Sequence, residues 1–458
     1  MQTVIIPAPP SKSLSHRALM AAALASGTSH LTQVLESADT ARTREVLSAL
    51  GADFAHTAPG CFAVIGTGGK VLAPDSKQDI PLSVDVGESG TTCRLLTAIL
   101  AAGNGKFRVH GAGRMHERPL GELAGVLREL GAHITFEQKD NCPPFILDAD
   151  GLHQTAALDG REMVSMISSD ESSQYISGLL LAAPLGSGLV IGLGGRRAVS
   201  WPYVGLTLNI LEDFGISFTV LELDQGQWRE IDWRSIREAE PGKLRFRVLP
   251  GMYQARDYAV EGDWSGASYF LAAGAIGPRP VCVTGLNRHS LQGDAALIDI
   301  LVAMGARVEY GDNSITVHPS LLKGVNVDMG HCPDLVPTVA ALAAHAVGPT
   351  HISNVAHLKI KESDRLAAPA QELAKTGSEV AMHEDGLLIQ PHEGGPKTPE
   401  SGTVFSAHND HRIAMSVSLL GLPGTRPGNP GFAVPLDQPD CVGKSFPHFW
   451  NLWEKVRC

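Results

Sequence analysis

The stretch KSLSHRALMAAALASG, residues 12–27, combines a polar first turn, a run of small apolar residues and a closing Gly, and a β-branched segment follows it. The same pattern occurs five more times, ending at Gly103, Gly186, Gly277, Gly348 and Gly421. Successive copies are 76, 83, 91, 71 and 73 residues apart. Such regular self-similarity indicates a repeated structural unit. Six units in 458 residues predict two similar domains of three units each.

A second pattern follows in most units: an amphipathic helix, a Gly, and a strand of alternating character. Its copies are VLSALGADF, VLRELGAHITF, ILEDFGISFTV, ILVAMGARVEY and ELAKTGSEV. In both patterns we expect the Gly to close the helix in the left-handed conformation. The alternation predicts strands with one buried face. The Ala-rich helices should be buried and the amphipathic ones should cover the outside. The fold class is therefore α/β, with the two halves meeting after a polar insertion at residues 221–247.

The composition bounds the function. Hydrophobic residues make up 43% and charged residues 19% of the chain, which is an ordinary globular balance. The formal net charge of −11 disfavours nucleic acid or an anionic membrane as the partner, because both need a broad basic surface. A small anion needs only a few well-placed Lys and Arg side chains, so the acidic composition is compatible with small anions as ligands.

Targeting and redox features favour the cytoplasm. The N-terminal MQTVIIPAPPSKS resembles neither a signal nor a transit peptide. The longest uncharged stretch, residues 175–195, contains Pro184 and several Gly, and we expect helix, turn and strand there instead of a membrane span. The seven Cys are odd in number and form no C-x-x-C pair, which disfavours disulfides and zinc and fits a reducing compartment.

The starts of the small-residue helices are candidate anion sites. A helix N-terminus carries unpaired N–H groups and a partial positive charge, and neighbouring hydroxyl or cationic side chains strengthen the attraction. The polar residues at these starts are Ser11, Lys12, Ser13, Ser15, Arg17, Ser89, Gly90, Thr91, Thr92, Arg94, Ser172, Ser173, Gln174, His411 and Arg412. For any single Ser, simple N-capping is the favoured interpretation. Lys and Arg recurring on first turns favour binding.

Four further segments carry charge between these helices. R-M-H-E-R-P-L-G places Arg118 before a Pro that opens a helix, and C-P-D-L sets Asp334 at a helix start. K-I-K-E-S-D-R-L would put Lys361 and Arg365 on one face if it were helical. D-C-V-G-K-S-F-P brings Lys444 into a turn. A solvated face with local ion pairs is the alternative interpretation. H-N-D-H, residues 408–411, has no carboxylate-rich partner motif, so we expect no metal site.

Together, nine segments resemble those of the 5-enolpyruvylshikimate-3-phosphate synthase family, in the family's order from Pro7 to Pro447. They are P-S-K-S-L-S-H-R, G-E-S-G-T-T-C-R, H-E-R-P-L-G, S-S-Q-Y, S-W-P-Y, V-E-G-D-W-S-G-A-S-Y-F-L, K-I-K-E-S-D-R, N-D-H-R and D-C-V-G-K-S-F-P. Each segment alone is a weak signal, whereas nine in order are specific.

The resemblance implies a fold and a reaction. The family has two domains of three βαβαββ units each, an inside-out α/β barrel arrangement with the active site in the interdomain cleft. By resemblance, one domain is residues 13–257 and the other is residues 1–12 plus 258–458. The implied reaction transfers the enolpyruvyl group of phosphoenolpyruvate to the 5-hydroxyl of shikimate 3-phosphate, through a tetrahedral intermediate, for aromatic amino-acid synthesis. The implied enzyme is a cytoplasmic monomer that needs no cofactor or metal and binds only these small molecules.

The resemblance also implies the site residues. Shikimate 3-phosphate should contact Lys12, Ser13, Arg17, Ser172, Ser173, Gln174, Ser200, Asp334 and Lys361. Phosphoenolpyruvate should contact Lys12, Gly90, Arg118, Gln174, Arg365, Arg412 and Lys444. The implied catalytic residues are Asp334, Glu362, Lys12 and His411. Asp334 is the implied base for the hydroxyl proton. Glu362 is the implied acid for the methylene carbon, a role that requires a raised pKa.

Several positions depart from the family pattern: Pro10, Glu88, His357, Trp264 and Pro369. A carboxylate at residue 88 would repel an anion unless it were paired, and a Pro at residue 369 should bend or restart its helix. Gly90 is the small residue at the position where extra bulk would exclude the inhibitor glyphosate.

Three rival functions predict other features. An enolpyruvyl transferase acting on UDP-N-acetylglucosamine would use a loop Cys and would lack the S-K-S…R start. An RNA 3′-phosphate cyclase would need a basic surface. A non-catalytic binding protein would have lost Asp334 or Glu362, and both are present.

Overall fold

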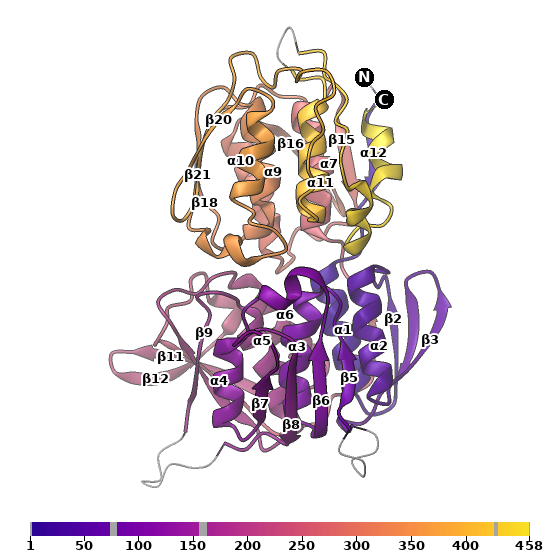
Figure 1. Ribbon diagram of the computed structural model, residues 1–458, viewed down its shortest axis with the longest axis vertical. Coiled ribbons are helices and arrows are strands. Elements are labelled where there is room, and N and C mark those ends of the chain that lie inside the picture. The colour runs from indigo at the N-terminus through magenta and orange to yellow at the C-terminus, as the bar shows by residue number, and fades with distance from the viewer. Residues whose placement is uncertain (1, 74–79, 155–162, 426–428, 458) are drawn as a thin grey trace. The chain divides into compact units, whose positions relative to one another are not determined.

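The computed structural model describes residues 2–73, 80–154, 163–425 and 429–457 (Figure 1). It divides into two compact units. We call Lys12–Val260 the N-terminal unit, and Met1–Ser11 with Glu261–Cys458 the C-terminal unit. The sequence analysis expected the divisions after residues 12 and 257.

The second repeat of the N-terminal unit shows the basic pattern. Its elements are β5 (Leu82–Asp85), α3 (Gly90–Ala101), β6 (Asn104–His110), α4 (Gly121–Glu129), β7 (His133–Phe136) and β8 (Phe145–Asp150). The sheet order is β5-β6-β8-β7. β5 and β6 are parallel and are joined through α3, whereas β8 is antiparallel to both β6 and β7. This is the predicted βαβαββ unit.

The same sheet order recurs in the first and third repeats. The first contains α1 (Lys12–Leu24), β2 (Thr28–Thr32), α2 (Ala38–Ala49), β3 (Asp53–Ala58) and β4 (Cys61–Ile65), and its outer parallel strand is β14 (Asp257–Ala259). The third contains β9 (Ser165–Ser168), α5 (Gln174–Ala182), β10 (Leu189–Gly194), α6 (Pro202–Asp213), β11 (Phe218–Asp224), β12 (Gln227–Ile231) and β13 (Leu244–Val248). The polar insertion therefore supplies β12, an added edge strand beside β11.

The C-terminal unit contains two further copies. The first is β1 (Val4–Pro7), α7 (Trp264–Ile276), β15 (Val281–Thr284), α8 (Leu297–Ala303), β16 (Arg307–Gly311) and β17 (Ser314–His318). The second is β18 (Asn326–Asp328), α9 (Val336–His345), β19 (Thr350–Ser353), α10 (Ala367–Ala374), β20 (Glu379–Met382) and β21 (Leu387–Gln390). β1 pairs in parallel with β15, so the N-terminal strand belongs to this unit.

The sixth repeat differs from the predicted pattern. It contains α11 (His411–Val417), the 3-10 helices η8 (Ser418–Gly421) and η9 (Pro439–Lys444), and α12 (Phe449–Arg457). In its described part, an isolated bridge between Phe405 and Leu436 takes the place of a four-stranded sheet. Rings of α12 instead pack on α7, with the Phe449 and Phe270 centroids 5.5 Å apart. Aromatic packing thus closes this end of the unit.

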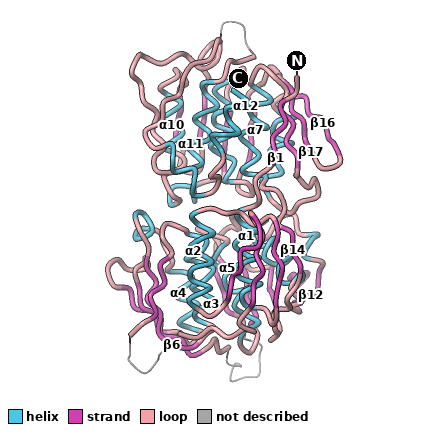
Figure 2. Tube along the Cα trace, turned by 90° about the vertical axis from the view of Figure 1, so that its right-hand side faces the viewer, coloured by secondary structure: helices cyan, strands magenta, loops and turns pink. Residues whose placement is uncertain are grey.

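The small-residue helices form the core, as predicted. Most residues of α1, α3, α5, α7, α9 and α11 are buried. α3 packs against α5, and α9 packs against both α7 and α11. Figure 2 shows the helices of each unit gathered together, with strands towards the outside. The buried helices thus leave little of their length in contact with solvent.

The Gly positions confirm one expectation and correct another. All five Gly residues after the amphipathic helices have positive φ: Gly51, Gly131, Gly215, Gly305 and Gly377. After the small-residue helices only Gly27 and Gly348 do, so the left-handed cap was wrongly expected at Gly103, Gly186, Gly277 and Gly421. At three of these positions the Gly is required by close packing, because an added Cβ would clash with a backbone oxygen. The oxygen belongs to Val71 at Gly103, to Ala273 at Gly277 and to Phe432 at Gly421.

The contact between α3 and α5 depends on Gly178. A Cβ there would lie 2.9 Å from the Arg94 carbonyl oxygen and 3.2 Å from the Ala98 Cβ. We expect Gly178→Ala to lower the free energy of unfolding by about 1–3 kcal/mol, because the two helices must move apart. A Cβ added at Gly125 in α4 would meet no atom within 4 Å, so Gly125→Ala should raise stability by about 0.5–1 kcal/mol. Urea unfolding at pH 7 measures both changes, and equal effects would contradict this packing.

Candidate active site

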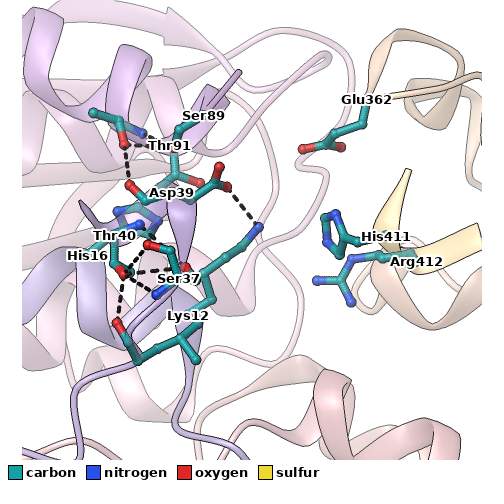
Figure 3. Close-up of polar contacts among 12 residues, drawn as sticks. Lys12, His16, Ser37, Asp39, Thr40, Ser89, Thr91, Glu362, His411 and Arg412 are labelled. Carbon is teal, nitrogen blue, oxygen red and sulfur yellow. Dashed lines mark hydrogen bonds and ion pairs between the residues drawn. The ribbon is translucent and has the colours of Figure 1, made fainter. Parts of the chain in front are cut away.

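Lys12 is the first residue of α1, and an acidic residue of α2 holds it in place. Its Nζ lies 3.3 Å from Oδ2 of Asp39, and both side chains are largely buried (Figure 3). Ser37 caps α2 and so places Asp39 in the first helical turn, where the helix dipole favours a carboxylate. The sequence analysis missed Asp39, although a Ser two residues before an acidic residue is a helix-start signal.

A chain of buried hydroxyls connects α1, α2 and α3. Nδ1 of His16 lies 2.7 Å from Oγ1 of Thr43, which lies 2.8 Å from Oγ1 of Thr92. Thr92 donates in turn to Oγ of Ser89, the N-cap of α3, at 2.7 Å. Burial, reinforced by the charges of Lys12 and Arg17, lowers the pKa of His16 well below its usual value. The ring is therefore neutral near pH 7 and acts as a fixed hydrogen-bonding link.

Arg17 is buried and donates hydrogen bonds to several protein atoms. Nε donates to Oγ1 of Thr207 at 2.8 Å, and Nη2 donates to the Tyr203 carbonyl at 3.0 Å. Nη1 donates to the Ser13 carbonyl at 3.0 Å. Burial lowers the pKa of Arg17 to about 10, so it stays charged at neutral pH. Arg17 thus ties the start of α1 to α6, and its contact with shikimate stays a prediction.

Gly90 and Arg118 lie against each other at the start of α3. A Cβ on Gly90 would be 2.5 Å from Cζ of Arg118, whose side chain is buried. Gln174, the first residue of α5, accepts from Nη1 of Arg94 at 3.1 Å and donates to Oγ1 of Thr91 at 3.0 Å. The starts of α3 and α5 are therefore joined. Gly90 and Gln174 begin these two helices, and Arg118, from the segment before α4, packs against Gly90.

Three buried serines lie near the starts of α5 and α6. Ser172 accepts from the Gln174 backbone N–H at 3.2 Å, and Ser173 is the N-cap position of α5. Ser200 has φ of 55°, which is uncommon for a residue with a side chain. Backbone strain of this kind often accompanies a functional position. Their proposed contact with the phosphate of shikimate 3-phosphate stays a prediction.

Arg365 is the centre of the charged cluster in the C-terminal unit. Its Nε lies 2.7 Å from Oδ2 of Asp410, its Nη1 lies 2.9 Å from Oδ1 of Asp334, and its Nη2 lies 2.8 Å from Oε2 of Glu362. Nη2 of Arg412 reaches the other Asp334 oxygen at 2.6 Å. Only 3% of the Arg365 side chain and none of the Asp410 side chain is exposed. Four predicted residues, Asp334, Glu362, Arg365 and Arg412, thus lie in one cluster with Asp410, which was not predicted.

The Arg365 cluster keeps its groups ionised although they are buried. Burial by itself would raise the pKa of Asp410, but Arg365 and the backbone N–H of Arg412 hold it below the usual value. Burial opposes the charge on Arg365, and the neighbouring carboxylates more than offset this, so its pKa is raised. Asp410 is also the N-cap of α11. The sequence contained this signal, an Asp just before a helix, but H-N-D-H was considered only as a metal motif.

The segment carrying Glu362 and Arg365 is not helical, so Lys361 and Arg365 do not share a helix face. It lies between the 3-10 helix η7 (Ala356–Ile360) and α10. Oδ1 of Asp364 accepts from the N–H groups of residues 366 and 367, both at 3.0 Å, and this starts α10 only at Ala367. Pro369 falls in the first turn, where a missing N–H is tolerated, so the helix restarts there instead of bending.

The remaining predicted residues are carried by the same unit. Asp334 lies in the 3-10 helix η6 (Pro333–Leu335), directly before α9. His411 and Arg412 are buried at the start of α11 (Figure 3). Lys444 ends η9, which packs against α11, and Lys361 directly follows η7. Substrate binding by Lys361 and Lys444 stays a prediction that rests on their charge and on their positions in the chain.

The departures from the family pattern are accommodated structurally. Pro10 lies in an extended segment bridged to Gly262. Trp264 begins α7 as a buried residue, and its Nε1 donates to the Asn287 carbonyl at 3.1 Å. His357 is buried in η7. Glu88 directly precedes the N-cap of α3, and its carboxylate lies against Gly113.

Metal-binding and membrane-spanning features are absent from the described ranges. Those residues contain no group of three His, Cys, Asp or Glu side chains arranged to hold a metal ion. They also contain no helix with the length and apolar character needed to cross a membrane. The six described cysteines are free, and Cys458 lies outside the described residues.

Comparison with known proteins identifies the relatives of this chain. The family model for EPSP synthase (3-phosphoshikimate 1-carboxyvinyltransferase) matches residues 2–229 and 235–453. A 3-phosphoshikimate 1-carboxyvinyltransferase of Aeromonas salmonicida is 38% identical over 450 residues, covering 98% of this chain and 95% of its own. One of Sulfurovum sp. is also 38% identical, over 453 residues, with 98% and 95% covered.

Solved structures share the fold. EPSP synthase from Acinetobacter baumannii has a TM-score of 0.74 at 24% identity, covering 99% of this chain and 96% of its own. The enolpyruvyl transferase NikO from Streptomyces tendae has a TM-score of 0.68 at 20% identity, with 100% and 94% covered. The predicted α/β fold class with two similar domains is confirmed.

The Arg365 cluster predicts an acid-sensitive contribution to stability. Asp410 has a lower pKa in the folded protein than in the unfolded chain, so its contribution is complete above about pH 4 and disappears as the pH falls through the folded value. We expect Asp410→Asn to lose about 3 kcal/mol of unfolding free energy at pH 7. The difference from the unsubstituted protein should shrink as the pH falls below about 4, the ordinary Asp pKa, towards the lower folded value.

Urea unfolding across this pH range provides the measurement. Asp148→Asn is the matched control, because Asp148 is half exposed and lies 3.9 Å from Lys106. An exposed pair should contribute less than about 1 kcal/mol. Equal losses in the two variants at pH 7 would contradict a special role for Asp410.

Proposed function

The chain belongs to the EPSP synthase family, and on this premise we propose that the Arg365 cluster and the polar helix starts of the N-terminal unit carry out the family's transfer. The enolpyruvyl group moves from phosphoenolpyruvate to the 5-hydroxyl of shikimate 3-phosphate, and phosphate is released. The reaction serves the shikimate pathway of aromatic amino-acid synthesis. The cytoplasmic location and the monomeric state stay predictions.

The observation that supports this proposal best is the pair of guanidinium groups on Asp334. Arg365 and Arg412 each contact one oxygen of this carboxylate, at 2.9 and 2.6 Å. Guanidinium forks match the two oxygens of a carboxylate, so both arginines suit the carboxylate of phosphoenolpyruvate. The same contacts favour the ionised form of Asp334, which is the form that a general base requires.

Glu362 is the proposed acid, and binding of the substrate would prepare it for that role. Its carboxylate contacts Arg365 at 2.8 Å, which favours the ionised form. Phosphoenolpyruvate would bring negative charge to Arg365 and Arg412. This added charge weakens the attraction that Arg365 exerts on Glu362 and favours its protonated form.

The proposed chemistry has two steps. In the addition, the substrate hydroxyl oxygen bonds to the central carbon of phosphoenolpyruvate, Asp334 accepts the hydroxyl proton, and Glu362 donates a proton to the methylene carbon. In the elimination, the bond from that carbon to the phosphate oxygen breaks, the new methyl group returns one proton to Glu362, and phosphate leaves with the proton that Asp334 had accepted. Lys12, Lys444 and His411 lie on helix starts or ends, from which they would stabilise the charge on phosphate.

The N-terminal unit is proposed to bind shikimate 3-phosphate. Its predicted contacts are mostly neutral donors at joined helix starts: Ser13, Ser172, Ser173, Gln174 and Ser200. Helix N-termini with hydroxyl groups are suited to phosphate. Lys12 would exchange its contact with Asp39 for one with a substrate anion, so Asp39 keeps the ammonium in place until substrate arrives.

Asp334→Asn tests the role of the base. We expect turnover to fall by roughly 10²–10⁴-fold, because the amide cannot accept the hydroxyl proton. Binding of shikimate 3-phosphate should stay within a few fold, which calorimetry can measure beside phosphate release from phosphoenolpyruvate. Asp148→Asn is again the control. Normal turnover in Asp334→Asn would remove it from the mechanism, and activity with UDP-N-acetylglucosamine in place of shikimate 3-phosphate would overturn the substrate assignment.

Gly90→Ala tests the position of Arg118. The new Cβ would lie 2.5 Å from Cζ, so the guanidinium must move. We expect KM for phosphoenolpyruvate to rise roughly 10- to 100-fold, with KM for shikimate 3-phosphate unchanged and inhibition by glyphosate weakened. Gly125→Ala, which meets open space, should leave all three values unchanged. An unchanged KM for phosphoenolpyruvate in Gly90→Ala would exclude Arg118 from its binding.

A further inference from the structure

A cavity of about 330 Å³ lies in the sixth repeat of the C-terminal unit. Its walls come from η8, the segment around residues 432–436, η9 and α12. None of its lining residues belongs to the proposed active site. A space of this size is in the range of small-molecule sites. The cavity lies in the sixth repeat, whose described part has an isolated bridge where the other repeats have a sheet of four or five strands. The space that such a sheet would occupy is therefore partly open.

The walls of the cavity are aromatic and are held in place. Trp450, Trp453 and Phe432 line it. The Trp453 ring is stacked on Phe449 with centroids 5.5 Å apart, and Nε1 of Trp450 donates to the Pro439 carbonyl at 2.9 Å. These contacts prevent the indoles from collapsing into the space. Aromatic walls of this kind favour a ligand that contains a planar ring.

Charged groups of both signs surround the aromatic walls. Glu454 and Arg457 are three residues apart on α12, form a long ion pair at 3.8 Å, and are more than half exposed. Asp440 of η9 adds a second carboxylate. Carboxylates and indole faces both attract an ammonium group, and a guanidinium attracts a carboxylate. The set of charges therefore matches a ligand that carries one ammonium and one carboxylate.

We propose that this cavity binds a free aromatic α-amino acid. Its ring would lie among Trp450, Trp453 and Phe432. Its ammonium group would contact Asp440 and Glu454, and its carboxylate would contact Arg457. The weak Glu454–Arg457 pair would open to accept the two ends of the ligand.

The cavity is connected to the proposed active site through η9. Pro439 and Asp440 at the start of η9 line the cavity, and Lys444 ends the same 3-10 helix. η9 also packs against α11, which begins with His411 and Arg412. Occupancy of the cavity should therefore shift Lys444 and change KM for phosphoenolpyruvate. This coupling rests on the proposed function, whereas binding of the amino acid does not.

Calorimetry on the full chain tests the binding with L-phenylalanine and three partial analogues. Phenethylamine lacks the carboxylate, 3-phenylpropionate lacks the ammonium group, and L-leucine lacks the ring. We expect saturable 1:1 binding of L-phenylalanine, and binding of each analogue weaker by roughly tenfold or more, since each loses one set of contacts. Absence of saturable binding, or equal affinity for phenethylamine, would overturn the proposed ligand class.

Variants of the two exposed charges locate the binding. Glu454→Gln and Arg457→Gln should each weaken binding of L-phenylalanine by roughly tenfold without affecting folding, because surface pairs contribute little to stability. The matched controls are Glu240→Gln and Lys243→Gln, an exposed pair of the same spacing in the N-terminal unit. Unchanged binding in the α12 variants would place the ligand elsewhere.

The coupling between the cavity and the proposed active site is tested by a separate kinetic measurement. KM for phosphoenolpyruvate, measured with saturating L-phenylalanine, should change in the unsubstituted enzyme and not in Arg457→Gln. If L-phenylalanine binds at 1:1 and KM does not change, the connection through Lys444 is wrong and the binding site stands. If the enzyme does not act on phosphoenolpyruvate, the proposed function fails, and calorimetry still decides the binding.

Discussion

The close approach of buried helices is the constraint on which the rest of this structure depends. α3 and α5 touch at Gly178, where no side chain separates the backbones. Helices packed in this way leave little room for polar side chains along their length. Polar groups gather towards the helix starts, and His16, Thr43 and Thr92 link α1, α2 and α3 through hydrogen bonds of 2.7 and 2.8 Å. The packing of the core thus decides where the polar side chains lie.

The two units present different chemistry on the same scaffold. The N-terminal unit offers mainly hydroxyl, amide and backbone groups, with Lys12 held by Asp39. The C-terminal unit concentrates its charges around Arg365, whose three carboxylate partners lie between 2.7 and 2.9 Å. Neutral donors can bind a phosphate that remains intact, whereas a fixed cluster of charges can stabilise charge that develops during a reaction. The units are related in fold and differ in the side chains that they carry at their helix starts.

Asp410 explains how so many charges can stay buried. Without it, Arg365 would lose its most deeply buried partner, and a buried charge that is poorly paired is strongly destabilising. As the N-cap of α11, Asp410 also fixes the start of the helix that carries Arg412. Lys12 is likewise paired with Asp39, and Asp334 is paired with Arg365 and Arg412.

The sequence alone determined the repeats, the order of helices and strands, the buried and exposed faces and the family, because these follow from local patterns and from motifs read in order. It could not determine that Arg17 bonds to Thr207, 190 residues away, or that Asp334 joins Arg412, 78 residues away. It also missed Asp410, the non-helical path through Glu362 and the reduced sixth repeat. Partners so distant along the chain are selected by packing, and only the tertiary structure brings them within hydrogen-bonding distance.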